Sequence, residues 1–179
     1  NCENLTKVEI PTNSNLQTIE DYAFLYSHIN EIYIPSKVSK ICESTFSNCS
    51  CLEKVIIQPD SNLQTIESDA FKSTNIIEIY IPSKVSKICR GAFQYCSNLS
   101  KVIFPTNSNL QTIEIFAFYK TNIKEIHIPS TVSEIGEYAF SDSKIKNLII
   151  PSKVAILSKC AFFNCTNLKI VEISEDSKL

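Results

Sequence analysis

The stretch EIYIPSKVSKIC occupies residues 31–42, and the same letters occur again at residues 78–89. The two copies start at Glu31 and Glu78, a separation of 47 residues. An identical segment at a fixed distance indicates internal repeats, and repeats decide the fold class before single elements do.

The rest of the chain follows this pattern at half that spacing. An apolar residue opens each unit at intervals of 22 to 24 residues: Leu5, Ile29, Leu52, Ile76, Leu99, Ile123, Ile145 and Leu168. A phenylalanine follows in seven units: Phe24, Phe46, Phe71, Phe93, Phe118, Phe140 and Phe162. Units with NLQTIE alternate with units carrying PSKVS or a close variant, so duplication of a unit pair accounts for the longer period. These anchors predict seven full repeats of 22–24 residues plus one strand, in a single domain over residues 1–179.

Each unit combines a short strand with a second apolar segment. Residues 29–34 are rich in isoleucine, with apolar side chains at alternate positions toward the end, as in a β-strand. Pro35 follows, and because proline has no amide hydrogen it ends the ladder. The leg with Val38, Ile41 and Phe46 is too short for a full helix, so we expect short irregular or extended structure. Stacked units share one continuous core, which predicts a solenoid.

Composition excludes several function classes. The chain has 17 basic and 19 acidic residues and a net charge of −2, so no basic excess points to nucleic acid. No apolar run reaches about 18 residues, the length needed to span a membrane, so this segment is not expected to insert directly. The chain starts at Asn1 and contains no Met, so we expect it to be a fragment of a longer protein.

The unit IKEIHIPSTVSEIGEYAFSDSK at residues 123–144 resembles the leucine-rich repeats, and among them the BspA-like (Treponema pallidum-type) subclass. Other units depart slightly: IIQP at residues 56–59 inserts a residue, and Cys42 and Cys89 replace the glycine seen at Gly136. The resemblance implies a right-handed leucine-rich repeat solenoid, with a parallel sheet on one face and short irregular or extended legs opposite. It also implies binding or adhesion at a cell surface or outside the cell.

Two columns of side chains are expected to point outward from the sheet. The third position of each unit alternates in charge through Lys7, Glu31, Lys54, Glu78, Lys101 and Glu125. Neighbouring parallel strands lie about 4.8 Å apart, so opposite charges on them attract weakly. The charge ladder can fix register and keep the face soluble, or form the rim of a binding surface.

The fifth position carries a different column, the apolar stripe, formed by Tyr33, Ile56, Tyr80, Ile103, His127 and Ile149. A half-exposed sheet normally has polar residues here, so an unbroken stripe suggests a contact surface. Tyrosine suits such a surface because it offers contact area and a hydroxyl group. The alternative is β-propensity, since tyrosine and isoleucine also pack well across strands.

The cysteines are predicted to be free thiols, mostly buried. Cys2, Cys49 and Cys96 lie two coils apart, or about 9–10 Å, which exceeds the span of a disulfide. No metal site is expected, because Cys49 and Cys51 have no second cysteine pair and the two histidines are 99 residues apart. Glycosylation sequons at Asn4, Asn48, Asn98 and Asn164 can equally be turn residues.

No motif indicates catalysis or a cofactor: the chain has no glycine-rich phosphate loop, no GxSxG and no HExxH. We therefore expect a non-enzymatic module that recognises a host or matrix protein or a glycan. The alternatives are an array that associates with itself through the solenoid ends or the apolar stripe, and an intracellular scaffold. The expected location is the cell surface or outside the cell, as the resemblance implies, and the free cysteines make the cytoplasm the alternative.

Overall fold

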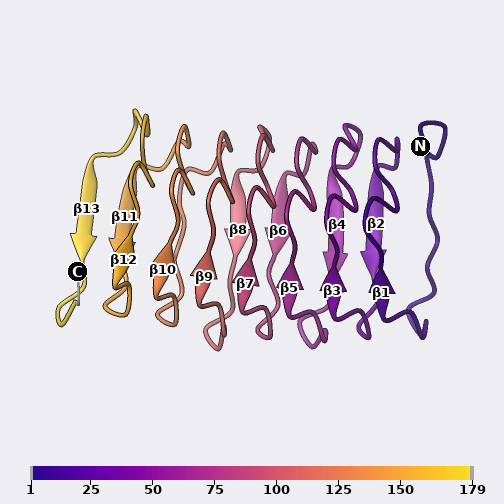
Figure 1. Ribbon diagram of the computed structural model, residues 1–179, viewed down its shortest axis with the longest axis horizontal. Helices are drawn as coiled ribbons and strands as arrows, with labels where there is room; N and C mark the ends of the chain where they lie inside the picture. The colour runs from indigo at the N-terminus through magenta and orange to yellow at the C-terminus, as the bar shows by residue number, and fades with distance from the viewer. Residues whose placement is uncertain (1, 178–179) are drawn as a thin grey trace.

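The computed structural model describes residues 2–177, which form a parallel β-solenoid without helices (Figure 1). Successive coils stack along one axis, with the two ends of the chain at opposite ends of the molecule. The solenoid predicted from the repeats, and the leucine-rich repeat class implied by the resemblance, are confirmed.

One side of the solenoid, the front face, carries the strands that the repeat pattern predicts. Four of them pair in one parallel sheet: β2 (Glu31–Ile34), β4 (Lys54–Ile57), β6 (Glu78–Tyr80) and β8 (Lys101–Ile103). A second parallel pair joins β11 (Asn147–Ile150) to β13 (Ile170–Ile173).

The opposite side is more regular than the sequence suggests. The legs form the back sheet, a parallel sheet of seven two-residue strands in coil order: β1 (Thr18–Ile19), β3 (Lys40–Ile41), β5 (Thr65–Ile66), β7 (Lys87–Ile88), β9 (Thr112–Ile113), β10 (Glu134–Ile135) and β12 (Ile156–Leu157). The expectation of short extended legs holds, and stacking at equal height lets each leg pair with the next.

Two of the expected front strands do not form. Residues 5–10 and 123–128 have no strand assignment, because their main chains make no ladder with a neighbouring coil. Within residues 2–177, the main chain of Glu125–Ile128 takes part in no hydrogen bond. The front face is therefore divided between β8 and β11.

The core contains a continuous stack of the seven predicted phenylalanines. Neighbouring rings from Phe24 to Phe162 have centroids 5.2–5.5 Å apart and interplanar angles of 1–9°. Isoleucine, leucine and valine from both sheets fill the space on either side of this stack. Burying one large apolar side chain contributes about 1.5–3 kcal/mol before entropy is subtracted, so coil stacking is the main source of stability.

The chain turns with almost no glycine. Each coil has two residues with φ between 51° and 61°, one just before the Ala-Phe pair (Thr-Phe in the second coil) and one four positions later. The first set is Tyr22, Ser44, Asp69, Gly91, Phe116, Tyr138 and Cys160. Main-chain bonds from this turn to the next coil, such as Phe46 N to Ala70 O at 2.8 Å, hold the conformation in place.

Candidate binding face

The front strands place the two predicted columns outward. In β2 and β4 the burial alternates, with the first residue exposed, the second and fourth buried, and the third half-buried. Alternation follows from the strand, in which successive side chains point to opposite faces. The charge ladder therefore lies at the exposed position and the apolar stripe at the half-buried one.

The charge ladder is in register over four strands. Glu31 lies beside Lys54, Lys54 beside Glu78, and Glu78 beside Lys101. Two ion pairs form, Lys54 Nζ to Glu31 Oε2 at 3.5 Å and Lys101 Nζ to Glu78 Oε2 at 3.8 Å. Pairs this exposed contribute about 0–1 kcal/mol each, so the ladder favours register more than stability.

The two ends of the charge ladder behave differently from its centre. Lys7 pairs with Glu9 of its own coil at 2.5 Å. This hydrogen bond raises the pKa of Lys7 and lowers the pKa of Glu9. At the other end, Glu125 lies on the unpaired rung and has no ion pair in the described part of the chain.

The apolar stripe is most exposed toward the C-terminal end. Tyr33 lies beside Ile56 and Tyr80 beside Ile103, and all four side chains are half-buried because they cover one another. His127 is exposed, and 54% of Ile149 is open to solvent. Packing across neighbouring strands thus explains why the first four members are apolar, whereas the side chains of His127 and Ile149 remain available for contact with a ligand.

A groove of about 480 Å³ opens between these last two members of the stripe. Its lining includes His127, Ile149, Glu125 and Asn147, together with three serines and one proline from the turns: Ser130, Pro151, Ser152 and Ser174. It thus combines an isoleucine surface with an imidazole, an amide, a carboxylate and hydroxyl groups. Asn147 and the serines were not among the site residues predicted from the sequence. Ser130 and Ser152 do share a signal, because each ends a copy of the recurrent IPS motif.

The comparisons with known proteins bear on this geometry. The sequence profile described as BspA type leucine rich repeat region (6 copies) matches residues 1–100 and 88–178. The chain belongs to the BspA-type leucine-rich repeat family. A comparison with curated proteins gives no significant match.

Solved structures share the fold of this BspA-type chain. A leucine-rich repeat protein from Bacteroides ovatus is 22% identical, with a TM-score of 0.60, over 98% of this chain and 62% of that one. The T. pallidum leucine-rich repeat protein is 20% identical, with a TM-score of 0.61, over 91% of this chain and 67% of that one. A leucine-rich cell surface protein from Faecalibacterium prausnitzii is 20% identical, with a TM-score of 0.51, over 97% of this chain and 74% of that one. The chain thus spans less than two thirds of the Bacteroides protein.

The BspA-type repeats enclose a column of small polar residues next to the phenylalanine stack. One member comes from each coil: Ser27, Cys49, Thr74, Cys96, Thr121, Ser143 and Cys165, all buried. Cys49, Cys96 and Cys165 each lie 3.2 Å from the hydroxyl of the preceding coil. Each thiol also donates to a phenylalanine carbonyl of that coil. The column explains why cysteine recurs in this slot, as a residue that satisfies buried polar groups.

The other cysteines are more varied than the prediction of mostly buried thiols. Cys42 is buried, Cys89 and Cys160 are half-buried, and Cys2 and Cys51 are exposed. Desolvation raises the pKa of Cys96 to about 11 and that of Cys89 to about 11. These two thiols are therefore protonated at neutral pH.

An aromatic ridge on the turn edge was not predicted from the sequence. Phe116 stacks on Tyr138 at 5.3 Å, Tyr95 and Tyr119 meet edge to face at 5.5 Å, and Phe163 packs against Tyr138. Lys120 lies over the rings of Tyr95 and Tyr119. Four coils supply these residues from more than one turn position, so no single repeated motif marks the ridge.

Two of the four sequon asparagines, Asn48 and Asn164, lie at the second left-handed turn position, with φ of 58° and 55°. This geometry agrees with their interpretation as turn residues, since asparagine tolerates this conformation. The side-chain amide of Asn164 also donates to Asp142 Oδ1.

Proposed function

We propose that the chain is a non-enzymatic binding module that recognises a protein or glycan through its front face. Leucine-rich repeat proteins typically act as binding scaffolds, and the described residues include no helix able to cross a membrane. The supporting observation is the C-terminal end of the apolar stripe. His127 and Ile149 are exposed there, unlike the four half-buried members before them, and both line the groove.

The groove suits a ligand that presents both an apolar surface and hydrogen-bonding groups. Ile149 offers contact area at the centre, and charged or polar groups surround it at Glu125, His127 and Asn147. Buried apolar anchors with a polar rim are the usual anatomy of a binding surface. Lys101 and Glu78 then belong to the rim of the same face.

Two isoleucines of one coil provide a matched test. Ile149 lies on the front face and Ile156 on the back sheet, and each is 54% exposed. Ligands would be selected by screening glycan and protein arrays with the unaltered chain. We expect Ile149→Glu to abolish binding and Ile156→Glu to leave it unchanged. Equal binding by both variants would show that the front face is not the binding surface.

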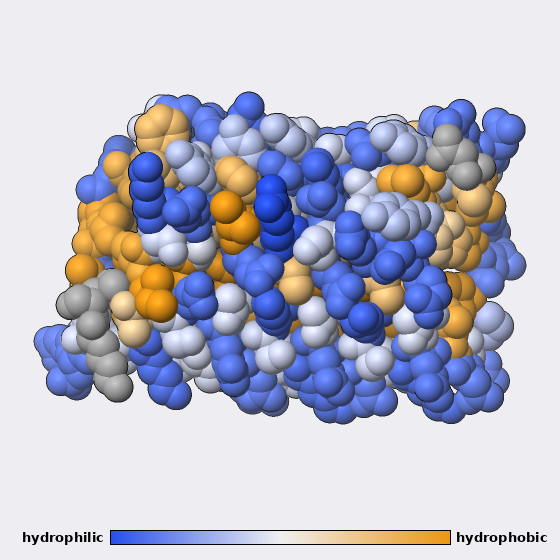
Figure 2. All heavy atoms as spheres, in the orientation of Figure 1, coloured by the Kyte–Doolittle hydropathy of each residue, from blue (hydrophilic) through white to orange (hydrophobic). Residues whose placement is uncertain are grey.

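A second candidate, self-association, is favoured by the exposed end of the solenoid. Ile170, Val171 and Ile173 of β13 are each about half exposed, and Figure 2 shows apolar side chains gathered at the ends of the molecule. A neighbouring coil or a second copy of the chain would cover such a surface. Sedimentation velocity over a hundredfold concentration range separates the two, because only self-association raises the sedimentation coefficient with concentration.

For location, we propose the cell surface. One structural relative is described as a leucine-rich cell surface protein. Detection on intact cells with an antibody that does not enter them tests this proposal, and a signal seen only after permeabilisation would favour the intracellular scaffold.

A further inference from the structure

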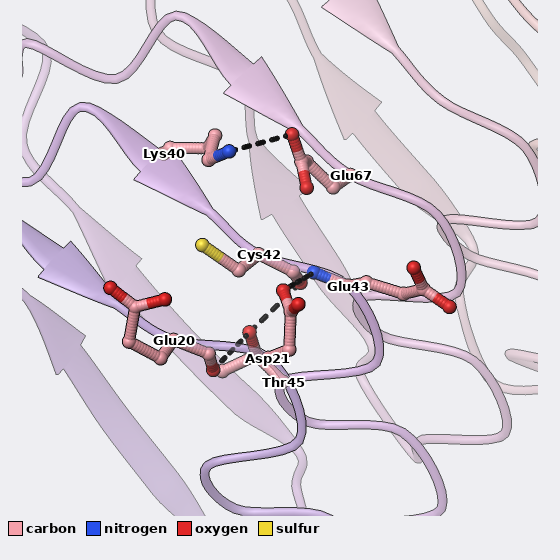
Figure 3. Close-up of polar contacts among 7 residues, drawn as sticks. All are labelled: Glu20, Asp21, Lys40, Cys42, Glu43, Thr45 and Glu67. Atoms are coloured by element: carbon pink, nitrogen blue, oxygen red, sulfur yellow. Dashed lines mark hydrogen bonds and ion pairs between the residues drawn. The ribbon is translucent and has the colours of Figure 1, made fainter.

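Three side chains that can bind a metal ion converge where the first three back-sheet strands end. Asp21, Cys42 and Glu67 follow β1, β3 and β5, and their possible ligand atoms all lie within 4.8 Å of one another. Figure 3 shows the three side chains coming from successive coils. The sequence predicts no metal site, because it holds no second cysteine pair and its two histidines lie far apart. Asp21, Cys42 and Glu67 escape that reasoning because whole repeats separate them.

Cys42 is the unusual member of this group. It is only 2% exposed, and within residues 2–177 no hydrogen bond to its sulfur is found. The buried cysteines of the polar column differ, since Cys49 and Cys96 each have two such partners. A buried sulfur without a hydrogen bond, within 4.8 Å of one oxygen of each of two carboxylates, is a potential ligand that the fold itself does not use.

Each carboxylate has one oxygen engaged in the fold. Asp21 Oδ1 accepts a hydrogen bond from the amide of Glu43 at 3.0 Å, and Glu67 Oε1 pairs with Lys40 Nζ at 3.1 Å. The second oxygen of each has no hydrogen bond or ion pair in the described part of the chain. The amide of Glu43 thus positions Asp21 while leaving one oxygen for a ligand.

The charges around the sulfur favour a cation. Burial raises the pKa of the Cys42 thiol, Lys40 partly opposes this, and the carboxylates of Glu67, Asp21 and Glu20 add to it. The negative potential that disfavours a bare thiolate would be relieved by a divalent ion.

We propose that Asp21, Cys42 and Glu67 bind one Zn²⁺ ion through the Cys42 thiolate and one oxygen of each carboxylate, with water in the fourth position. Zinc accepts sulfur and oxygen ligands together, whereas Mg²⁺ and Ca²⁺ take oxygen alone. Ligands of a tetrahedral zinc ion lie about 3.5 Å apart, so small rotations of the accessible carboxylates complete the site. Binding forms the zinc–sulfur bond and releases the thiol proton to solvent, without oxidation or reduction.

The duplicated segment supplies an internal control. Cys89 occupies the place of Cys42 in the second copy, but Ser68 stands where the first copy has Asp21. Both oxygens of Glu114, the counterpart of Glu67, are already bound there, one by Lys87 Nζ at 2.7 Å and one by the amide of Arg90 at 2.8 Å. The same twelve residues thus form a site in one context and lack its ligands in the other.

The test measures zinc affinity and stoichiometry of the full chain against a chromophoric chelator, in a reductant without thiols. We expect one ion per chain, an affinity loss of at least about tenfold in Cys42→Ser and Asp21→Ser, and no change in Cys89→Ser. Because Asp21 is exposed, its variant remains informative if Cys42→Ser folds poorly. Lys40→Gln removes a competing cation and should tighten binding, whereas Lys87→Gln should not.

Two further readouts distinguish this site from adventitious binding. Co²⁺ should give a thiolate-to-metal charge-transfer band that persists in Cys89→Ser and is lost in Cys42→Ser. Because one proton competes with the metal, apparent affinity should rise about tenfold per pH unit below the thiol pKa. A cobalt complex without the thiolate band, or equal losses in the two cysteine variants, would overturn the proposal. Either result leaves the front-face function untouched, since the site lies at the back sheet.

Discussion

Cysteine 96 shows how one residue can link the stability of the solenoid to pH. Its thiol is fully buried, donates to the carbonyl of Phe71 and lies 3.2 Å from the hydroxyl of Thr74. Desolvation raises its pKa from 9.0 to about 11, because the thiolate would be buried without a cation nearby.

The pH dependence has a definite sign. Below pH 9 the thiol is protonated in both the folded and the unfolded chain, so its contribution is fully present. Between pH 9 and about 11 only the unfolded chain loses the proton, so stability falls, by up to about 3 kcal/mol. Threonine occupies this position in the neighbouring coils, so Cys96→Thr should remove the part of the stability loss that the thiol causes. Urea denaturation at pH 7–11 measures the free energy of unfolding of both chains. If that free energy fell equally with pH in the variant and the unaltered chain, Cys96 would not be the group responsible.

Gly136 is a second residue at which local space decides stability. An added Cβ would lie 2.6 Å from Ile115 N and 2.7 Å from the carbonyl carbon of Glu114, both main-chain atoms. We therefore expect Gly136→Ala to lower the free energy of unfolding by about 1–3 kcal/mol. Glu137→Ala, at the exposed neighbouring position, serves as the control and should change it little. A neutral effect of Gly136→Ala would mean that the main chain shifts to accommodate the methyl group.

At the scale of elements, the phenylalanine stack connects every coil to the next. Phe93 is fully buried between Phe71 and Phe118, with ring centroids 5.3 Å away on both sides. Phe162 ends the stack, is half-buried and has one stacked neighbour, Phe140. The repeat spacing predicts this stack, because equal positions in equal coils lie above one another.

The stack predicts unequal costs for the same truncation. Phe93→Ala should destabilise the chain by about 3–5 kcal/mol, because it leaves a cavity with stacked rings on both sides. Phe162→Ala should cost clearly less, since solvent already reaches the ring. Chemical denaturation of both variants measures the difference, and equal losses would show that the coils contribute independently of their neighbours.

At the scale of the whole molecule, the front face is interrupted although the core is continuous. Ile126 is 6% exposed and packs in the core, yet the main chain of its rung has no ladder within residues 2–177. The groove lies at this interruption. The proposed binding face thus coincides with the place where regular stacking of the front strands fails.

Hydrogen exchange tests this division of the front face. The amides of Ile126, His127 and Ile128 should exchange faster than those of β4 and β8, despite their central place in the solenoid. Exchange resolved by residue with NMR or mass spectrometry provides the measurement. Protection of residues 126–128 equal to that of β8 would show that the ladder continues in solution.

The sequence by itself determines the coil. Spacing of 22 to 24 residues, alternating apolar positions and the proline after the strand predict the stacked parallel strands, the buried phenylalanines and the outward position of Tyr33, Tyr80 and Lys54. These features repeat, so each follows from contacts between equal positions. Only the tertiary structure decides where the repeats differ: the back sheet as a complete ladder, the broken rung at Glu125–Ile128, and the meeting of Asp21, Cys42 and Glu67. The repeat spacing places equivalent positions of successive coils side by side, but it does not specify which side chains there meet or which rung fails to pair.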